Sequence, residues 1–399
     1  MRVGIFTDQY YPIISGVVTS IQMLKDGLEE RGHEVYIFTS FDEKGITELP
    51  PDNVINIPGR SYPFKNLKDY RYTLTHKRFV KIVKKYDLDI IHLQTEFNIA
   101  KIAKLAHKKL RIPVVHTMHT LWSDYFKYVS PFFDKHAHKL MEAGLRKLFM
   151  NSCAKMSEIQ IVPTKKVYDQ RKKYALGKEI RIVPTGIELD RFYPQNLDNE
   201  KIAKLKKEYN LLDDSFVFLY IGRTSDEKNI PTLLKAFAKT KLNNAKFLLV
   251  GGGPELADLK TLVKELKIDD KVIFTGLIEW KEIPYYYQLG DVFLNASQSE
   301  TQGLTYIEAL ASGKPLLVQK DECIDDVVVD YYNGIFFDGE EELTKKMKEI
   351  VKAPDTLKTI KANTLKSVEN YSKNNFVNNV LDIYNEAIEM YNNKEKKDN

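Results

Sequence analysis

The stretch Ser299–Gly313 reads SETQGLTYIEALASG and follows a strand-like apolar run, Val292–Ala296. It places two carboxylates, Glu300 and Glu308, on either side of a glycine turn at Gly303. If Glu300 precedes a helix and Glu308 lies two turns into it, the pair spans roughly 12 Å at about 1.5 Å per residue. Carboxylates accept hydrogen bonds from sugar hydroxyls, and a helix start favours phosphate. The stretch therefore predicts a site for the hexose, diphosphate and ribose of a nucleotide-sugar, although a surface loop before an ordinary amphipathic helix fits too.

Strand-like apolar runs alternate with helical patterns along the chain. The expected strands are Arg2–Phe6, Glu34–Thr39, Ile90–Leu93, Val114–His116, Ile159–Pro163, Phe216–Tyr220, Lys246–Val250, Val272–Phe274, Val292–Asn295, Lys314–Val318 and Gly334–Phe337. The expected helices include Val18–Arg31, Asn229–Lys239, Glu255–Leu266 and Thr305–Ala311. Such alternation is typical of parallel sheets with helices on both faces. The sequence therefore predicts an α/β fold of two doubly wound, Rossmann-like domains, in which ligands bind at the carboxyl ends of the strands.

Length and composition also fit two domains, because a chain of 399 residues that is 43% hydrophobic can bury two cores. A polar linker with one proline is expected near Phe192–Glu200, which gives domains at 1–195 and 196–375. The helical pattern Phe376–Tyr391 and a polar tail, Asn392–Asn399, make up residues 376–399. We expect the tail to be disordered.

Several classes of protein are disfavoured by what the sequence lacks. No apolar run approaches about 18 residues, and residues 1–15 carry no signal-peptide pattern, so neither a membrane-spanning helix nor a leader is expected. Cys153 and Cys323 lie far apart and are expected to be reduced, which suits the cytoplasm. No cluster of His, Cys and carboxylates has metal-ligand spacing, so no structural metal is expected.

Charge is distributed unevenly along the chain, whose net charge is +5. Residues 1–195 hold 32 Lys and Arg against 21 Asp and Glu, whereas residues 196–399 hold 28 against 34. This asymmetry predicts that the first domain faces an anionic surface, and both acidic lipid and nucleic acid are candidates. Chance in a lysine-rich chain is the alternative explanation.

A basic segment, Phe64–Lys85, concentrates this charge. Against one acid, Asp69, it carries Lys65, Lys68, Arg71, Lys77, Arg78, Lys81, Lys84 and Lys85. Interleaved apolar residues suit an interfacial helix on anionic lipid, where each cation contributes roughly 1 kcal/mol. A core-facing helix with a basic solvent side explains the same pattern. The aromatic segment Leu121–Phe133, with Trp122, Tyr125 and Phe126, is a second membrane or acyl-chain candidate that could equally pack in the core.

Four further candidate residues follow expected strands. Arg223 and Lys228 come after Phe216–Tyr220, where two cations can neutralise a diphosphate, unless they are solvated loop charges. Gly16 follows the first strand, and a glycine either lets the backbone approach a ligand or marks a turn. His119 follows the run Val114–His116, where a structural histidine is the simpler interpretation.

Besides the Glu-x7-Glu spacing of Glu300 and Glu308, further segments stand in a recognisable order. They are MRVGIFTDQYYPIISGVV at 1–18, HTMHT at 116–120, VPTGIELDRFYP at 183–194, YIGRTSDEKN at 220–229, GGGP at 251–254 and FTG at 274–276. Together they resemble the retaining family 4 glycosyltransferases of the GT-B fold over nearly the whole chain. The segments ETQGL at 300–304 and SGVVTS at 15–20 look most similar to bacterial diacylglycerol glucosyltransferases. The resemblance implies two Rossmann-like domains that face a cleft, with the last helix returning to the first domain.

The resemblance also assigns roles to the candidate residues. Glu300 would hold a hexose hydroxyl, Glu308 the ribose hydroxyls, and His119 would lie at the donor hexose. The catalytic candidates are His119, Arg223, Lys228 and Glu300. The donor-binding candidates are Gly16, Arg223, Lys228, Gly276, Leu277, Glu300, Gln302, Gly303, Leu304 and Glu308. Among these, Arg223 and Lys228 would stabilise the departing diphosphate, the amides near Gly16 would meet that diphosphate, and Gly276 and Leu277 would line the base pocket.

The implied mechanism is front-side attack, because retaining enzymes of this fold generally lack an obvious protein nucleophile. The two-carboxylate scheme of glycosidases is therefore not transferred to Glu300 and Glu308. Diphosphate departure runs ahead, a phosphate oxygen takes the acceptor proton, and the protein supplies charge stabilisation and positioning. His119 is expected to orient a hydroxyl or stabilise positive charge, and it is not assigned as a general base.

The function implied is transfer of glucose from UDP-glucose to the hydroxyl of diacylglycerol. The enzyme would be cytoplasmic and peripheral on the inner face of the cell membrane, without a tightly bound cofactor, although free Mg²⁺ could support activity. The alternatives are a soluble or polysaccharide acceptor, an inactive lectin-like relic, and a nucleic-acid-binding protein. The nucleic-acid-binding alternative is weakened because the sequence has no known nucleic-acid-binding motif, and because it leaves Glu300 and Glu308 unexplained. The sequence does not decide whether the donor sugar is glucose or galactose, or whether its nucleotide is UDP or GDP.

Overall fold

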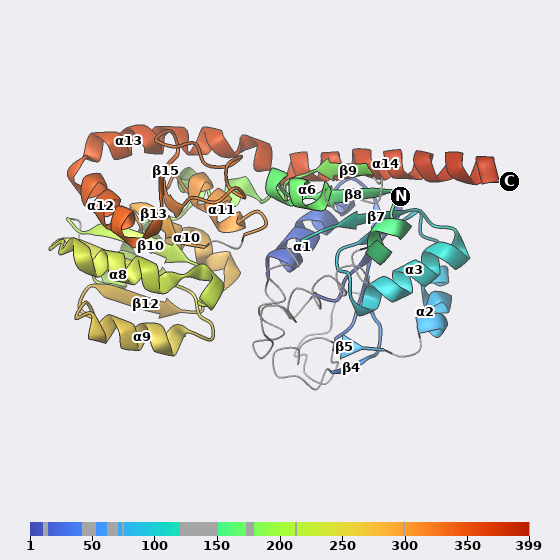
Figure 1. Ribbon diagram of the computed structural model, residues 1–399, viewed down its shortest axis with the longest axis horizontal. Coiled ribbons are helices and arrows are strands. Elements are labelled where there is room, and N and C mark those ends of the chain that lie inside the picture. The colour runs from blue at the N-terminus through green and yellow to red at the C-terminus, as the bar shows by residue number, and fades with distance from the viewer. Residues whose placement is uncertain are drawn as a thin grey trace. The chain divides into compact units, whose positions relative to one another are not determined.

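The computed structural model describes residues 1–10, 15–41, 53–61, 71–73, 76–119, 151–172, 179–211, 214–297 and 300–398. The chain divides into two compact units. The first unit combines Met1–Gly186 with Lys373–Asn399, and the second unit is Ile187–Ser372. Each unit contains its own parallel sheet with helices packed on it (Figure 1).

The first unit is built on a sheet of seven described strands. These are β1 Arg2–Phe6, β2 Glu34–Thr39, β3 Val54–Asn56, β6 Ile90–Leu93, β7 Val114–Thr117, β8 Ile159–Val162 and β9 Glu179–Ile182. All neighbours are parallel, in the order β3-β2-β1-β6-β7-β8-β9. A separate antiparallel pair joins β4 Arg60–Ser61 to β5 Arg71–Tyr72. The helices are α1 Gly16–Glu29, α2 His76–Val83, η3 Lys84–Tyr86, α3 Asn98–Leu110, α6 Lys165–Lys172 and α14 Lys373–Asp398.

Helices cover both faces of this sheet, and the central strands β1, β6, β7 and β8 are therefore almost fully buried. On one face Val3 and Ile5 pack with α1 and α14. On the other face Phe6 and Leu93 pack with α2 and α3. Gly27 of α1 allows α14 to approach closely, because a Cβ there would lie 2.4 Å from a methyl group of Val377.

The second unit is built on a sheet of six described strands. These are β10 Phe216–Ile221, β11 Ala245–Val250, β12 Val272–Gly276, β13 Val292–Asn295, β14 Leu316–Gln319 and β15 Gly334–Phe337, in the order β12-β11-β10-β13-β14-β15. All are parallel. The helices are α7 Asn199–Glu208, α8 Ile230–Thr240, α9 Leu256–Glu265, α10 Ile283–Tyr287, α11 Leu304–Ala311, α12 Gly339–Lys352 and α13 Pro354–Asn363. Short 3-10 turns are η4 Leu189–Arg191, η5 Pro194–Asn196, η6 Asp226–Lys228, η7 Trp280–Glu282 and η8 Leu365–Tyr371.

In both sheets the strand order changes direction at one point. Strand β1 lies between β2 and β6, and β10 lies between β11 and β13. The crossover helices leave opposite sides of such a point, so the loops after the two neighbouring strands stand open to a ligand. The fold therefore predicts one functional edge in each unit, after β1 and β6 and after β10 and β13.

The predicted α/β fold and its strands are confirmed. Arg2–Phe6, Glu34–Thr39, Ile90–Leu93, Val292–Asn295 and Gly334–Phe337 agree residue for residue, and the other predicted strands differ only near their ends. The unit boundary lies before Ile187, earlier than the predicted boundary at 195. The reason is that Ile187 N–H donates to Tyr371 O at 2.9 Å, and Leu189 and Phe192 enter the core of the second unit.

The prediction of a disordered tail is wrong for the residues that the structure describes. Helix α14 continues through Asp398 instead of ending at Tyr391. Arg111 forms an ion pair with Glu395 at 2.9 Å, and the ring of His107 lies 5.8 Å from the ring of Tyr391. These contacts with α3 and with the residue after it hold the last turns of the helix on the first unit.

Candidate functional site

A lysine and a glutamate from two different loops meet at the functional edge of the second unit. Lys228 ends η6, which follows β10, and Glu300 follows β13. The Lys228 Nζ lies 2.5 Å from Glu300 Oε1, and both side chains are mostly buried. Because β10 and β13 are parallel neighbours, their following loops emerge side by side. The structure thus brings together two residues that are 72 positions apart.

The loop that carries Lys228 also carries Arg223, whose side chain is exposed. The hydroxyl of Tyr220 donates to Arg223 O at 2.9 Å. The amide of Thr224 donates to Gly252 O at 3.0 Å. The loop backbone is therefore anchored, and the guanidinium of Arg223 is exposed, so a planar cation is presented to solvent at this edge.

Helix α11 begins at Leu304, after a turn formed by Gln302 and Gly303. Gly303 has φ +73°, a left-handed conformation that favours glycine. A Cβ at Gly303 would lie 2.3 Å from the ring of Tyr306, so the site also demands a residue without a side chain. Gln302 is buried, and Leu304 is the first helical residue. A glycine cap has no side chain to occupy the first helix amides, which leaves them to another acceptor such as phosphate.

Glu308 is buried about one turn into α11, nearer the helix start than the predicted two turns, and its carboxylate is held by a tyrosine. The hydroxyl of Tyr287, from α10, donates to Glu308 Oε2 at 2.8 Å. Burial raises the pKa of Glu308, while the hydrogen bond from Tyr287 and the charge of Arg191 lower it. Arg191 lies in η4 and stacks on Trp280, with its guanidinium carbon 3.3 Å from the ring centre. Neither Tyr287 nor Arg191 was predicted from the sequence, although Arg191 lies in the segment 183–194 that resembles the family.

The predicted base-pocket residues lie at the end of β12. Gly276 has φ +74°, and the amide of Gly251 donates to Gly276 O at 3.0 Å. Leu277 is 83% exposed, so its side chain is available to a ligand rather than to the core. A Cβ at Gly252 would meet the Leu277 side chain at 3.1 Å, which shows that the two loops lie against each other.

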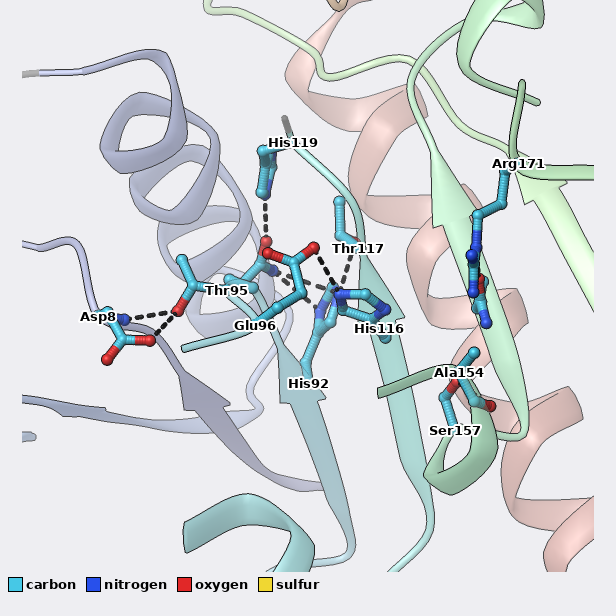
Figure 2. A network of polar contacts seen from close by, with 12 residues as sticks. Asp8, His92, Thr95, Glu96, His116, Thr117, His119, Ala154, Ser157 and Arg171 are labelled. Atoms are coloured by element: carbon cyan, nitrogen blue, oxygen red, sulfur yellow. Dashed lines mark hydrogen bonds and ion pairs between the residues drawn. The ribbon is translucent and has the colours of Figure 1, made fainter. Parts of the chain in front are cut away.

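In the first unit, His119 lies after β7 and contacts a glutamine that follows β6. His119 Nε2 lies 2.5 Å from Gln94 Oε1 (Figure 2 shows His119 beside His92 and His116). Burial and the neighbouring His116 lower the pKa of His119 to about 3. The ring is therefore neutral near pH 7 and is a weak base, which agrees with a positioning role. Gly16 is the exposed first residue of α1, and residues 11–14 of the predicted glycine loop lie outside the described residues.

Asp8, which the sequence analysis did not single out, lies at the same edge of the first sheet. Its Oδ1 accepts from the amides of Asn98 and Ile99 at 3.1 and 3.0 Å. Its Oδ2 accepts from the hydroxyl of Thr95 at 2.7 Å (Figure 2). It thereby satisfies the start of α3. Burial raises the pKa of Asp8 to about 6, the hydrogen bonds lower it, and nearby Glu96 raises it.

A second buried polar group lies on β7, β8 and α6 and in the loop after β6. Glu96 Oε1 lies 3.1 Å from His116 Nε2, and Arg171 Nε donates to Gln160 Oε1 at 2.6 Å (Figure 2). Burial lowers the pKa of Arg171, and the negative charge of Glu96 raises it. His116 belongs to the quoted HTMHT segment, whereas Glu96 and Arg171 stand singly and give no sequence signal.

The basic segment is a core-packed helix with a charged outer side. Phe79, Val80 and Val83 of α2 are buried. The outer side of α2 and η3 carries Lys77, Arg78, Lys81, Lys84 and Lys85, all exposed. The interfacial-helix interpretation, in which the apolar residues enter lipid, is therefore wrong for this helix, because those residues pack against the sheet and α3.

The other predicted membrane residues divide into two groups. Arg71 is half-buried in β5, and its Nη1 donates to Gly59 O at 3.0 Å, so it belongs to the β4–β5 pair. The remaining residues lie outside the described part of the chain; they are Lys65, Lys68, Trp122, Tyr125 and Phe126.

None of the helices built from described residues is both long and apolar enough to cross a bilayer. Within the same residues, no three His, Cys, Asp or Glu side chains are grouped so that they could hold a metal ion.

Comparison with solved structures places this fold among the GT-B glycosyltransferases. The Anabaena protein HepE, crystallised with UDP and glucose, has a TM-score of 0.75 at 17% identity and covers 97% of this chain and 100% of its own. The sucrose-phosphate synthase of Thermosynechococcus elongatus has a TM-score of 0.76 at 21% identity and covers 96% and 98%. At these identities the likeness shows the fold alone.

Sequence comparison identifies the family. The family described as Glycosyltransferase Family 4 matches residues 14–191, and Glycosyl transferases group 1 matches residues 201–367. The chain belongs to these glycosyltransferases and is a hexosyltransferase. The alpha-monoglucosyldiacylglycerol synthase of Acholeplasma laidlawii is 39% identical over 402 residues, with 100% of both chains covered. The enzyme of the same name from Streptococcus pneumoniae is 36% identical and covers 97% of this chain and 86% of its own.

We predict that Asp8→Asn changes how the stability of the enzyme depends on pH. The raised pKa means that the folded state binds the Asp8 proton more tightly than the unfolded chain, whose Asp pKa is near 3.8. Stability from this group is therefore lost as pH rises through the window from 3.8 to about 6. The neutral amide lacks this effect, so the variant should gain up to about 3 kcal/mol relative to the parent between pH 4 and pH 7.

Urea unfolding midpoints of both proteins at pH 4, 5, 6 and 7, followed by circular dichroism, measure this effect. Asp258→Asn is the control, because Asp258 is exposed on α9 in the second unit. Parallel pH curves for the parent and Asp8→Asn would show that Asp8 does not carry a raised pKa.

Proposed function

We propose that this enzyme transfers glucose from UDP-glucose to the hydroxyl of diacylglycerol, with retention of configuration, at an anionic membrane surface. The observation that carries the donor half is the meeting of Lys228 and Glu300 at the switch point of the second sheet. The acceptor half is supported by two relatives that match nearly the whole chain and are named alpha-monoglucosyldiacylglycerol synthases. The proposal therefore rests on this one contact and on full-length similarity.

In this proposal the second unit binds the donor through paired opposite charges. Glu300 accepts from a hexose hydroxyl, and Glu308 accepts from the ribose hydroxyls, with α11 between them. Lys228 and Arg223 face the diphosphate. Lys228 offers a compact ammonium charge, and Arg223 offers a planar guanidinium with several N–H donors. The Lys228–Glu300 contact keeps both groups extended and largely buried before the donor arrives. Such preorganisation lowers the cost of ordering these side chains on binding.

The proposed chemical step breaks the bond between the anomeric carbon and the diphosphate oxygen. The acceptor hydroxyl forms its new bond on the same face of the sugar, and its proton passes to a phosphate oxygen of the leaving UDP. Negative charge grows on the diphosphate as the bond breaks, so Lys228 and Arg223 stabilise the transition state more than the ground state. His119, which is neutral, accepts a hydrogen bond rather than removing a proton.

Membrane association in this proposal is electrostatic. The exposed cations of α2 and η3 attract anionic headgroups, while their apolar partners stay in the core. Binding of this kind weakens as salt screens the charges over a Debye length of about 8–10 Å. Electrostatic binding of this kind holds a polar protein surface at the bilayer without inserting it into the lipid. It suits a peripheral enzyme on the inner face of the cell membrane.

A donor–acceptor panel tests the proposal as a whole. Radiolabelled UDP-glucose, UDP-galactose and GDP-glucose are offered with diacylglycerol in anionic vesicles, with a soluble oligosaccharide, or with water alone, each with Mg²⁺ or EDTA. We expect labelled glycolipid with UDP-glucose and diacylglycerol, with the α-anomer identified by proton NMR. Transfer only to the oligosaccharide favours the soluble-acceptor alternative, and no transfer with tight RNA binding favours the nucleic-acid one.

Lys228→Ala is expected to lower kcat by on the order of 100-fold, because a charge aimed at the developing diphosphate is lost. The donor KM should change much less than kcat. The control is Lys235→Ala, which removes an exposed lysine from α8 of the same unit. Circular dichroism spectra that match the parent would show that the fold is intact, and an unchanged kcat in Lys228→Ala would reject its role.

Removing three cations from the outer side of α2 and η3 should weaken vesicle binding on the order of 100-fold at low salt, at roughly 1 kcal/mol for each charge. The variant is Lys77→Ala, Lys81→Ala and Lys84→Ala together. Flotation with vesicles containing anionic lipid measures the binding. The matched control removes three exposed lysines from the second unit, Lys235, Lys260 and Lys264. Equal loss in both triple variants would mean that net charge, rather than this face, determines the binding.

A further inference from the structure

A chain of buried polar contacts connects the terminal helix with His119. Tyr384 of α14 is fully buried, and its hydroxyl lies 2.7 Å from His92 Nδ1. The amide nitrogen of Gln94 lies 3.2 and 3.3 Å from the two ring nitrogens of His92. The amide oxygen of Gln94 lies 2.5 Å from His119 Nε2. Figure 2 shows the dashed contacts that run between His92 and His119. Four side chains therefore join α14 to a candidate catalytic residue.

The direction of each hydrogen bond follows from burial. Burial raises the pKa of Tyr384, so its hydroxyl keeps its proton, and a buried hydroxyl without an acceptor is costly. Tyr384 therefore donates to His92 Nδ1. Burial also lowers the pKa of His92, so the ring is neutral and carries one proton, on Nε2. That proton is donated to Thr117 Oγ1, which lies 2.7 Å away.

The orientation of the Gln94 side-chain amide determines the tautomer of His119. The amide nitrogen of Gln94, a donor only, lies almost equally far from the two ring nitrogens of His92, whose in-plane positions are taken by Tyr384 and Thr117, so it contacts the face of the ring. The amide oxygen of Gln94, an acceptor only, then faces His119. His119 must then carry its proton on Nε2. Its Nδ1 is left as an acceptor, and no residue in the described part of the chain makes a hydrogen bond to it. The orientation of one glutamine amide thus decides which ring nitrogen of His119 can serve a ligand.

We propose that Tyr384 and Gln94 are positioning residues that hold His119 in its Nε2–H form, with Nδ1 presented as the acceptor for a ligand hydroxyl. This rests on the proposed function, in which His119 accepts a hydrogen bond. The terminal helix then contributes to the active site as well as to the core of the first unit. A purely structural helix would need only the apolar contacts of Val377, Val380 and Ile383.

The titratable groups around His119 are the histidines of β6 and β7 and the carboxylates behind them. His116 and His92 face His119, Glu96 pairs with His116, and Asp8 lies near Glu96. None of these carboxylates contacts the His119 ring among the described residues. A carboxylate placed at position 94 would therefore be the first negative charge to touch that ring.

The direct test is nitrogen-15 NMR of the full chain labelled at histidine. The His119 signals, assigned with His119→Asn, should show the Nε2–H tautomer in the parent protein from pH 6 to 8. Tyr384→Phe should give a mixture of tautomers and about fivefold lower kcat, as expected for loss of one neutral hydrogen bond. Tyr391→Phe, the same change on the same helix beside His107, is the control and should change neither.

A pair of substitutions at position 94 supplies an independent measurement. Gln94→Glu should raise the pKa of His119 by charge attraction, so that kcat falls about tenfold relative to the parent as pH drops from 8 to 6. Gln94→Met keeps the volume and should lower kcat at every pH equally. If Tyr384→Phe does not fold, this pair and the parent spectrum decide the question.

Two outcomes would overturn the proposal. One is the Nδ1–H tautomer in the parent, and the other is a parent-like kcat and pH profile in Gln94→Glu. The NMR measurement needs no substrate, so it separates this proposal from the proposed function. An Nε2–H ring that responds to Tyr384→Phe, in a protein that transfers no sugar to any acceptor of the panel, supports the contact chain and rejects the assigned reaction.

Discussion

Parallel pairing of β10 with β13 is the constraint on which the proposed donor site depends. The two strands are separated by β11, β12 and their helices in sequence, but they are neighbours in the sheet. Their loops therefore start at the same edge, and Lys228 meets Glu300 across that edge. An ordinary crossover helix would cover this edge, but the strand order changes direction here and the connections leave on opposite sides. The same arrangement of β1 and β6 gathers Asp8, Thr95 and Gln94 in the first unit.

The sequence predicted the parts of this structure that depend on local order. Buried parallel strands are uninterrupted apolar runs, so their positions can be read without knowing their partners. The functional edge was also predictable in the second unit, because a glycine turn, two carboxylates and two cations follow strands directly. Gly303 illustrates the strength of that signal, since its left-handed φ and its closeness to Tyr306 both require glycine.

The remaining features depend on partners that are distant in sequence. Tyr384 and His92 are 292 residues apart, and each alone fits a helical or strand pattern without distinction. The sequence also could not show whether the apolar side of α2 faces lipid or the protein core. Its mixed pattern fits both, and only the packing of α3 against it decides for the core. The end of α14 was mispredicted for the same reason. Its polar sequence resembles a disordered tail, and its contacts with Arg111 and His107 come from residues distant in sequence.

The two units offer different chemistry at their functional edges, and burial explains the difference. The second unit presents cations beside carboxylates, and the Lys228–Glu300 contact compensates for the cost of removing both charges from water. The first unit presents histidines that burial keeps neutral, held by amides and hydroxyls. A neutral ring cannot select its own tautomer, so its neighbours must do so. The edge of the second unit is therefore suited to bind an anion, and the edge of the first unit is suited to direct a hydrogen bond.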